Sequence, residues 1–176
     1  NIVAFINERN GAGNTLFHQV AEYPKSLRLV LQRYPKQERY AAFCAVNHFH
    51  HSVLHRAVYN PESVQLICDE LPHDDQVQEL IEIQDETGKN ALFSAIAYTQ
   101  SFMTLWHRLS TDKQGQLLNV KNHDGNLMLH VAAEQNPEIL KFLLMVQNPS
   151  DPTEALLQKN NQDQSILFFA LKNPNS

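Results

Sequence analysis

The chain has 176 residues, of which 43% are apolar, and its formal net charge at pH 7 is −5. A chain of this length and composition is typical of one domain with an apolar core. It contains no run of Lys or Arg long enough to form a basic stripe, and its apolar stretches are far shorter than the roughly 20 residues of a membrane helix. We therefore expect no nucleic-acid partner and no membrane insertion.

The two cysteines, Cys44 and Cys68, both occur in apolar surroundings. Their spacing fits neither a zinc motif nor the dense disulfide framework of a small secreted domain. Small buried thiols are the expectation, in preference to a disulfide or a reactive cysteine. The cysteine content therefore predicts a reduced, intracellular, cytoplasmic protein.

One sequence pattern recurs five times, with successive copies 37 or 38 residues apart. In each copy a polar residue precedes a His or Phe by eight positions, and an apolar residue directly precedes that His or Phe. The His or Phe residues of the five copies are His18, His55, Phe93, His130 and Phe168, and the five polar residues are Asn10, Asn47, Asp85, Asn122 and Asn160. A fixed period of this size predicts stacked supersecondary units.

Each copy is expected to contain a turn followed by two antiparallel helices. The turn residues are Asn, Asp and Gly, which tolerate left-handed backbone. A dipeptide such as Asn136-Pro137 then ends the first helix and begins the second, because proline suits the first turn of a helix. We expect second helices near 24–33, 61–71, 99–109 and 137–147, and repeats over 9–45, 46–83, 84–120, 121–158 and, in part, 159–176.

The motif that opens each first helix resembles the ankyrin-repeat signature Thr-Pro-Leu-His-x-Ala. The five versions read TLFHQV, SVLHRA, NALFSA, LMLHVA and SILFFA, beginning at Thr15, Ser52, Asn90, Leu127 and Ser165. Five matches in phase cover nearly the whole chain. The resemblance implies an all-α ankyrin-repeat solenoid forming a single domain over 1–176.

Two features depart from that family. The period exceeds the family's repeat of about 33 residues by four or five, and the surplus lies in 35–46, 72–83, 110–120 and 149–159. Each surplus segment begins with a helix breaker or cap and ends in an apolar cluster, which predicts an extra short helix per repeat along the outer edge. In addition, the signature proline is absent, and Phe93 and Phe168 replace a histidine that in the family bonds neighbouring turn backbone.

Both ends of the chain interrupt the pattern. Residue 1 is Asn rather than Met, the segment 2–6 resembles the end of a preceding repeat, and Pro174 opens a second helix that is not completed. The fifth repeat is half a unit without a polar cap, and repeat stacks need polar terminal units. We therefore expect the chain to be a fragment of a longer protein.

Nine histidines raise the possibility of a metal or catalytic site. The repeat signature accounts for His18, His55 and His130 as structural residues. His51 and His55 are four residues apart, a spacing that permits shared metal ligation on a helix, but the sequence supplies no nearby carboxylate or cysteine to complete a set. Without a nucleophile motif or a phosphate-binding glycine loop, we expect neither an enzyme nor a bound cofactor.

Surface recognition is the remaining function. The resemblance implies that a protein partner binds the concave face, which the turn tips and the exposed sides of the first helices form. Carrying the family's variable positions over by offset gives the predicted binding residues Arg9, Tyr23, His48, Phe49, His51, Tyr59, Glu86, Thr87, Lys89, Tyr98, His123, Asp124, Asn126 and Glu134. A monomer that binds a protein partner of unknown identity is the leading hypothesis.

Two questions stay open at this stage. Tyr23, Tyr59 and Tyr98 either form an exposed row of binding residues or cover the corner between the two helices of a repeat. The chain is either an interaction module in its own right or the recruiting domain of a multidomain enzyme. The Asn-, Gln- and His-rich turns are similar to those in ankyrin regions of proteins that bacteria deliver into host cells, which would place such an effector in the host cytosol.

Overall fold

The computed structural model describes residues 2–147 and 153–172. The described residues form helices and turns without any strand; an isolated bridge pairs Lys159 with Ser165. The all-α fold class predicted from the sequence is therefore confirmed.

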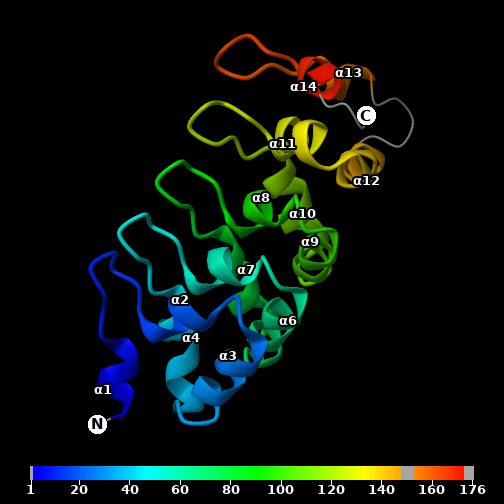
Figure 1. The fold of residues 1–176 in the computed structure, drawn as a ribbon. Helices are drawn as coiled ribbons and strands as arrows, with labels where there is room; N and C mark the ends of the chain where they lie inside the picture. Colours follow the sequence, from blue (N-terminus) through cyan, green and yellow to red (C-terminus); the bar gives the residue numbers. More distant parts are fainter. Residues whose placement is uncertain (1, 148–152, 173–176) are drawn as a thin grey trace.

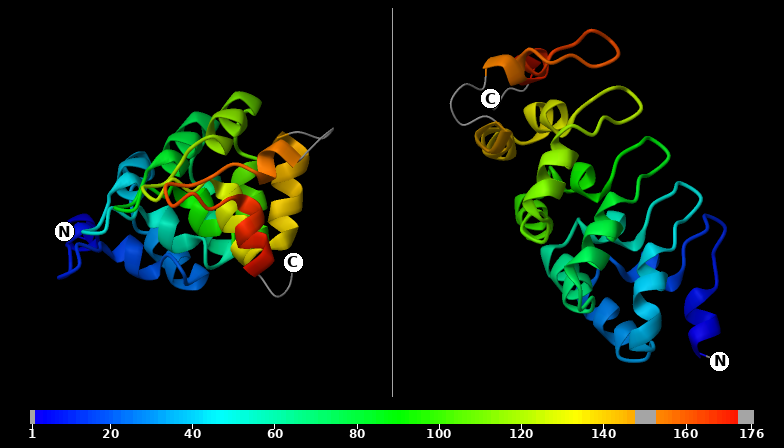
Figure 2. Two further views of the ribbon diagram at one scale, coloured as in Figure 1. Left: turned by 90° about the horizontal axis from the view of Figure 1, so that it is seen from above. Right: turned by 180° about the vertical axis from the view of Figure 1, so that it is seen from behind.

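The helices form a row of similar units in chain order. Every unit begins with a long turn, and the five turns project side by side from one side of the row (Figure 1, Figure 2). The row is bent, with the turns on the inner side of the bend (Figure 1). After α1 (Ile2–Asn7), the first helices of the units are α2 (Leu16–Val20), α5 (Val53–Ala57), α8 (Ala91–Ala95), α11 (Met128–Gln135) and α14 (Ile166–Lys172).

Second helices follow the first helices after a sharp corner. They are α3 (Pro24–Leu31), α6 (Pro61–Asp69), α9 (Thr99–Trp106) and α12 (Pro137–Gln147). All four begin where the sequence predicts, and in three of them a proline occupies the first helical position, where its missing N–H costs no hydrogen bond. The first three end two or three residues before the predicted position, because their last residues form a tighter turn into the next segment.

The extra short helix of each repeat is present. The surplus segments contain η1 (Lys36–Glu38) with α4 (Arg39–Cys44), α7 (Asp74–Glu82), α10 (Thr111–Leu118) and α13 (Thr153–Leu156); residues 149–152 of the last segment lie outside the described part. These helices lie deeper than the predicted outer-edge position. Phe43, Leu80 and Ile81 are fully buried, and α4 and α7 pack against α5 and α8, the first helices of the following units.

The core runs continuously along the row. Its side chains come from all three helices of a unit, for example Leu54, Ile67 and Leu80 in the second unit, each with no exposed surface. A single unit has too little apolar surface to form such a core alone, so stacking against neighbours stabilises it. At the last described helix, Leu167, Phe168 and Leu171 remain exposed.

Candidate functional site

The five turns share one geometry. In each turn the Oδ1 atom of the first polar residue accepts hydrogen bonds from the backbone N–H groups two and four residues later; Asn47 Oδ1, for example, lies 2.9 Å from Phe49 N and 3.0 Å from His51 N. The equivalent acceptors are Asn10, Asn47, Asp85, Asn122 and Asn160. This Asx-type bonding fixes the turn independently of any partner.

Every turn also contains one residue with positive φ. In the first, third and fourth turns it is Gly13, Gly88 and Gly125, whereas His50 (φ 58°) and Asp163 (φ 63°) occupy the position in the second and fifth. Glycine is favoured there because a side chain in this region is strained. A Cβ atom on Gly88 would also lie 2.7 Å from the His123 ring of the next turn.

Successive turns are joined by one backbone hydrogen bond each. His48 N donates to Ala12 O at 3.1 Å, Glu86 N to Phe49 O at 3.1 Å, and His123 N to Thr87 O at 2.9 Å. The fourth bond, from Asn161 N to Asp124 O, measures 3.0 Å. The turn tips are therefore aligned in register along the row.

Side chains make a second link between neighbouring turns, and we call these contacts the turn pairs. Each joins the last residue of one turn to the first polar residue of the next. In the first pair, Asn47 Nδ2 donates to Asn14 Oδ1 at 2.7 Å, and in the fourth, Asn160 Nδ2 donates to Asn126 Oδ1 at 2.8 Å. Both are ordinary amide–amide hydrogen bonds.

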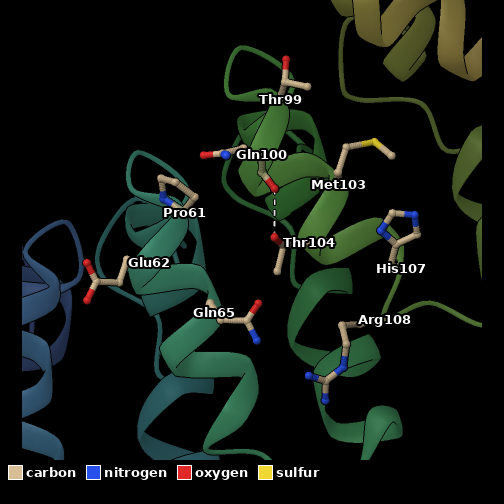
Figure 3. A pocket seen from close by; sticks show the side chains of 9 residues that line it. All are labelled: Pro61, Glu62, Gln65, Thr99, Gln100, Met103, Thr104, His107 and Arg108. Atoms are coloured by element: carbon tan, nitrogen blue, oxygen red, sulfur yellow. Dashed lines mark hydrogen bonds between the residues drawn. The ribbon is translucent and has the colours of Figure 1, made fainter.

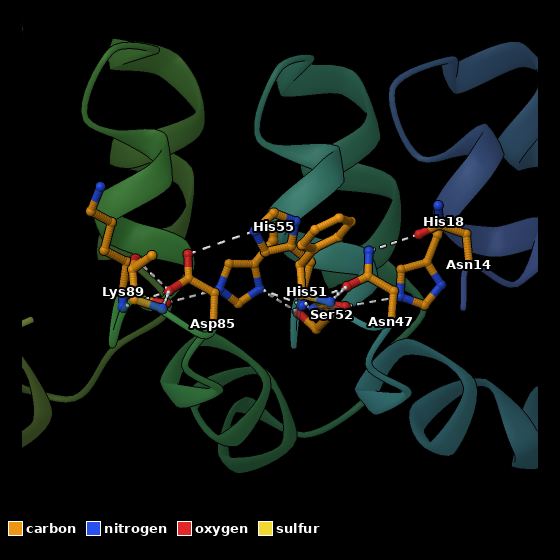
Figure 4. A network of polar contacts seen from close by, with 10 residues as sticks. Asn14, His18, Asn47, His51, Ser52, His55, Asp85 and Lys89 are labelled. Atoms are coloured by element: carbon orange, nitrogen blue, oxygen red, sulfur yellow. Dashed lines mark hydrogen bonds and ion pairs between the residues drawn. The ribbon is translucent and has the colours of Figure 1, made fainter. Parts of the chain in front are cut away.

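In the second turn pair the donor and acceptor roles of the two residues are exchanged (Figure 4). Asp85 replaces asparagine, so the atom that faces the preceding turn is an acceptor, and His51 Nε2 lies 3.6 Å from Asp85 Oδ2. Burial acts to raise the pKa of Asp85, but hydrogen bonds from Thr87 and Lys89 outweigh it and leave that pKa below its ordinary value. The His51 ring also stacks on the His55 ring, with centroids 5.4 Å apart.

The third turn pair is incomplete. Its two positions are occupied by Lys89 and Asn122, and the lysine side chain offers donors only. Asn122 Nδ2 is buried and has no hydrogen-bond partner. The Lys89 ammonium likewise forms no ion pair with any residue in the described ranges 2–147 and 153–172. The other pairs combine a donor with an acceptor, but this one has a donor-only side chain where an acceptor is needed.

The signature histidines connect the turns to the first helices (Figure 4). His55 Nδ1 accepts from Ser52 N at 3.1 Å, and His55 Nε2 donates to Lys89 O in the next turn at 3.1 Å. Burial lowers the pKa of His55 to about 4, so the ring is neutral at pH 7. His18 bonds Thr15 and His51 O in the same way. In the third unit Phe93 replaces the histidine, and the Asn90 side chain accepts hydrogen bonds from Leu92 N and Phe93 N at the start of the helix.

None of the fourteen predicted binding residues is buried, and all lie on the turn tips or at the ends of the first helices. Some of them also hold the turns together. Arg9 donates to Gly13 O and Val46 O, and the rings of His48 and His123 lie against Gly13 and Gly88 of the preceding turns. The side chains of Glu86, Asp124 and Glu134 are exposed; Glu86 and Asp124 link neighbouring turns through their backbone groups alone.

The tyrosines differ in their surroundings. Tyr23 is 60% exposed and Tyr59 48% exposed, whereas Tyr98 is partly buried. Tyr59 and Tyr98 meet edge to face with centroids 5.2 Å apart, and the Arg56 guanidinium lies 5.6 Å from the Tyr59 ring. The pair forms a rigid aromatic edge on the inner side of the row.

A pocket of about 280 Å³ lies beside this aromatic pair. It extends over the first helices of the second, third and fourth units, α5, α8 and α11. Four of the predicted binding residues, namely His51, Tyr59, Lys89 and Tyr98, contribute to its wall, together with His55, Arg56, Asp85, Phe93, Ser94, Ala97, Val131 and Gln135. Sequence reasoning missed Arg56 and Ser94, although their position one residue after the signature His or Phe is repeated and visible.

A larger hollow of about 670 Å³ lies between the second helices α6 and α9 (Figure 3). Its charged groups are already paired. Glu62 contacts Arg28, Arg108 contacts Asp74, and Thr104 Oγ1 donates to Gln100 O of its own helix. No residue of the predicted binding set lines this hollow.

Metal ligands, cysteines and membrane-length helices were the other features that the sequence raised. No group of three or more His, Cys, Asp and Glu side chains is placed to hold a metal there. Both cysteines are free thiols; Cys68 is buried, which raises its pKa to about 12, whereas Cys44 is only partly buried and so departs from the expectation. In that same part of the chain, no helix is long and apolar enough to cross a bilayer.

Comparison with known proteins does not assign the chain to a family. No protein-family model matches the sequence, and no curated protein matches it either.

Proposed function

We propose that the chain is a divergent ankyrin-repeat solenoid that binds a protein partner through its concave face. The observation that supports this most strongly is the register of the turns. Four backbone hydrogen bonds align five tips on the inner side of the bend, and none of the fourteen predicted binding residues is buried. A rigid array of turn tips suits recognition because its residues are ordered before binding.

The Tyr59–Tyr98 pair is the proposed centre of that surface. Tyrosine offers a large contact area with little side-chain entropy to lose, and it is enriched among residues that dominate binding energy. The pair borders a pocket of about 280 Å³, so a partner side chain has a place to insert next to it. The function is therefore recognition by a pre-formed surface, with no chemical step.

The test uses peptides from a phage-displayed library of random linear sequences, selected on the wild-type protein. Replacing both rings (Tyr59→Ala with Tyr98→Ala) removes the aromatic edge and should weaken peptide binding by about 2 kcal/mol, or roughly thirtyfold in Kd. The matched control is Leu29→Ala on α3, where the side chain is 55% exposed on the second-helix side. That variant should bind as the wild type does.

Urea denaturation separates a binding effect from a folding effect. Because Tyr59 is 48% exposed and Tyr98 is not fully buried, we expect the double variant to keep most of its stability. Selected peptides that bind the double variant as tightly as the wild type would contradict the proposal. A large fall in the urea midpoint would assign the rings to the core instead.

A further inference from the structure

One member of the incomplete third turn pair, Lys89, lines the pocket. Of the four pairs, the third alone has a donor-only side chain where an acceptor is needed, because Lys89 stands where Asn14 and Asn126 supply an amide oxygen. Asn122 is 95% buried, so its free N–H loses hydration without gaining a bond. The third pair thus lacks an acceptor that the neighbouring pairs have.

The charged groups around the pocket indicate which kind of group would complete it. Arg56 is paired with Glu22, and His51 faces Asp85. Asp85 Oδ1 already accepts three hydrogen bonds, from Thr87 N, Thr87 Oγ1 and Lys89 N. The Asp85 carboxylate of the same wall is thus held by hydrogen bonds of its own turn, and Lys89 forms no ion pair within the described residues.

The rest of the wall limits the occupant further. Tyr59, Tyr98 and Phe93 give it aromatic surface, and neither tyrosine hydroxyl takes part in a hydrogen bond in the described structure. A short acidic side chain on a peptide fits this combination, because its carboxylate reaches a cation and its methylene groups contact the rings. A basic side chain is disfavoured, since it would approach the Lys89 ammonium, which has no ion pair in the described structure.

We propose that this pocket binds an acidic side chain of a partner peptide, with the Lys89 ammonium as its counter-charge. The proposal rests on the proposed function and adds the chemistry of the partner and the residue that selects it. The Lys89 side chain extends from the turn beside the polar network, on the side of the first helices (Figure 4). The aromatic pair holds the peptide and Lys89 supplies the preference for a carboxylate.

The experiment compares library selections on the wild type, on Lys89→Met and on Lys89→Glu. Methionine keeps the length and apolar stem of the side chain and removes only the charge. Wild-type selections should converge on Asp or Glu at one position, and those peptides should bind Lys89→Met about five- to tenfold more weakly. Selections on Lys89→Glu should replace the acid by Lys or Arg.

The matched control is Lys25→Met, which removes an exposed lysine on α3 and should leave peptide affinity unchanged. Selections that enrich no acidic residue, or acidic peptides that bind Lys89→Met as tightly as the wild type, overturn the assignment. Should non-acidic peptides still depend on Tyr59 and Tyr98, only this assignment fails and the concave-face function stands. Peptides indifferent to Tyr59, Tyr98 and Lys89 overturn both.

Discussion

Lys89→Asn should stabilise the protein while removing its proposed selectivity. An asparagine at this position places an amide oxygen opposite Asn122 Nδ2, as Asn14 and Asn126 do in the first and fourth turn pairs at 2.7 and 2.8 Å. Leaving a buried donor unsatisfied costs about 1–3 kcal/mol. The backbone groups of Lys89 that bond Asp85 remain in place. We therefore expect a gain of about 1–2 kcal/mol in the free energy of unfolding.

The gain is measured by urea denaturation followed by far-UV circular dichroism and by the fluorescence of Trp106. This is the chain's single tryptophan, and it is buried in α9 of the third unit. Lys89→Met is the control, because it removes the charge without supplying an acceptor. If Lys89→Asn is no more stable than Lys89→Met, the missing acceptor does not affect the free energy of unfolding and the reasoning is refuted.

Two further predictions concern the turns and the signature histidine. Because burial lowers the pKa of His55 from 6.5 to about 4, unfolding takes up a proton between these pH values, so the free energy of unfolding should be full above pH 6.5 and fall by about 2 kcal/mol by pH 5. Urea denaturation of His55→Gln should show a flatter pH dependence, whereas the control His73→Gln, at an exposed histidine, should keep the wild-type dependence. Gly88→Ala should destabilise the protein by about 1–3 kcal/mol, because φ at this residue is +78° and the new Cβ would meet the His123 ring. In the same urea assay, Gly115→Ala should stabilise the protein by about 0.5–1 kcal/mol, because this glycine lies inside α10 and a Cβ there would meet nothing within 4 Å.

The repeat architecture was accessible from the sequence because each unit carries its own local signals. The Asn or Asp that fixes a turn, the left-handed Gly and the proline at the start of a second helix act within a few residues. Their recurrence every 37 or 38 positions then fixed the order of the units. The extra helices were also predictable, since their apolar clusters follow a breaker such as Pro35 or Pro72.

The depth of those extra helices could not be predicted in the same way. Phe43 and Leu80 are buried by the first helix of the following unit, a contact between units that no local pattern encodes. The first three second helices end earlier than predicted for a related reason: the chain forms a tight turn before the extra helix begins.

The candidate surface was predicted by position but not by chemistry. The repeat offsets placed His51, Tyr59, Lys89 and Tyr98 on one face, and they line one pocket. What the offsets did not reveal is that the first and last polar residues of neighbouring turns pair across the units. Once that register is known, the exchange to His51–Asp85 and the unpaired Lys89–Asn122 can be read from the sequence.

Hydrogen–deuterium exchange of the wild-type protein with a saturating selected acidic peptide tests the concave-face proposal most directly. We predict slowed exchange in the turns and first helices of the second to fourth units, strongest around Asp85–Tyr98, with α3, α6 and α9 unchanged. Protection confined to α6 and α9, around the hollow between the second helices, would contradict it.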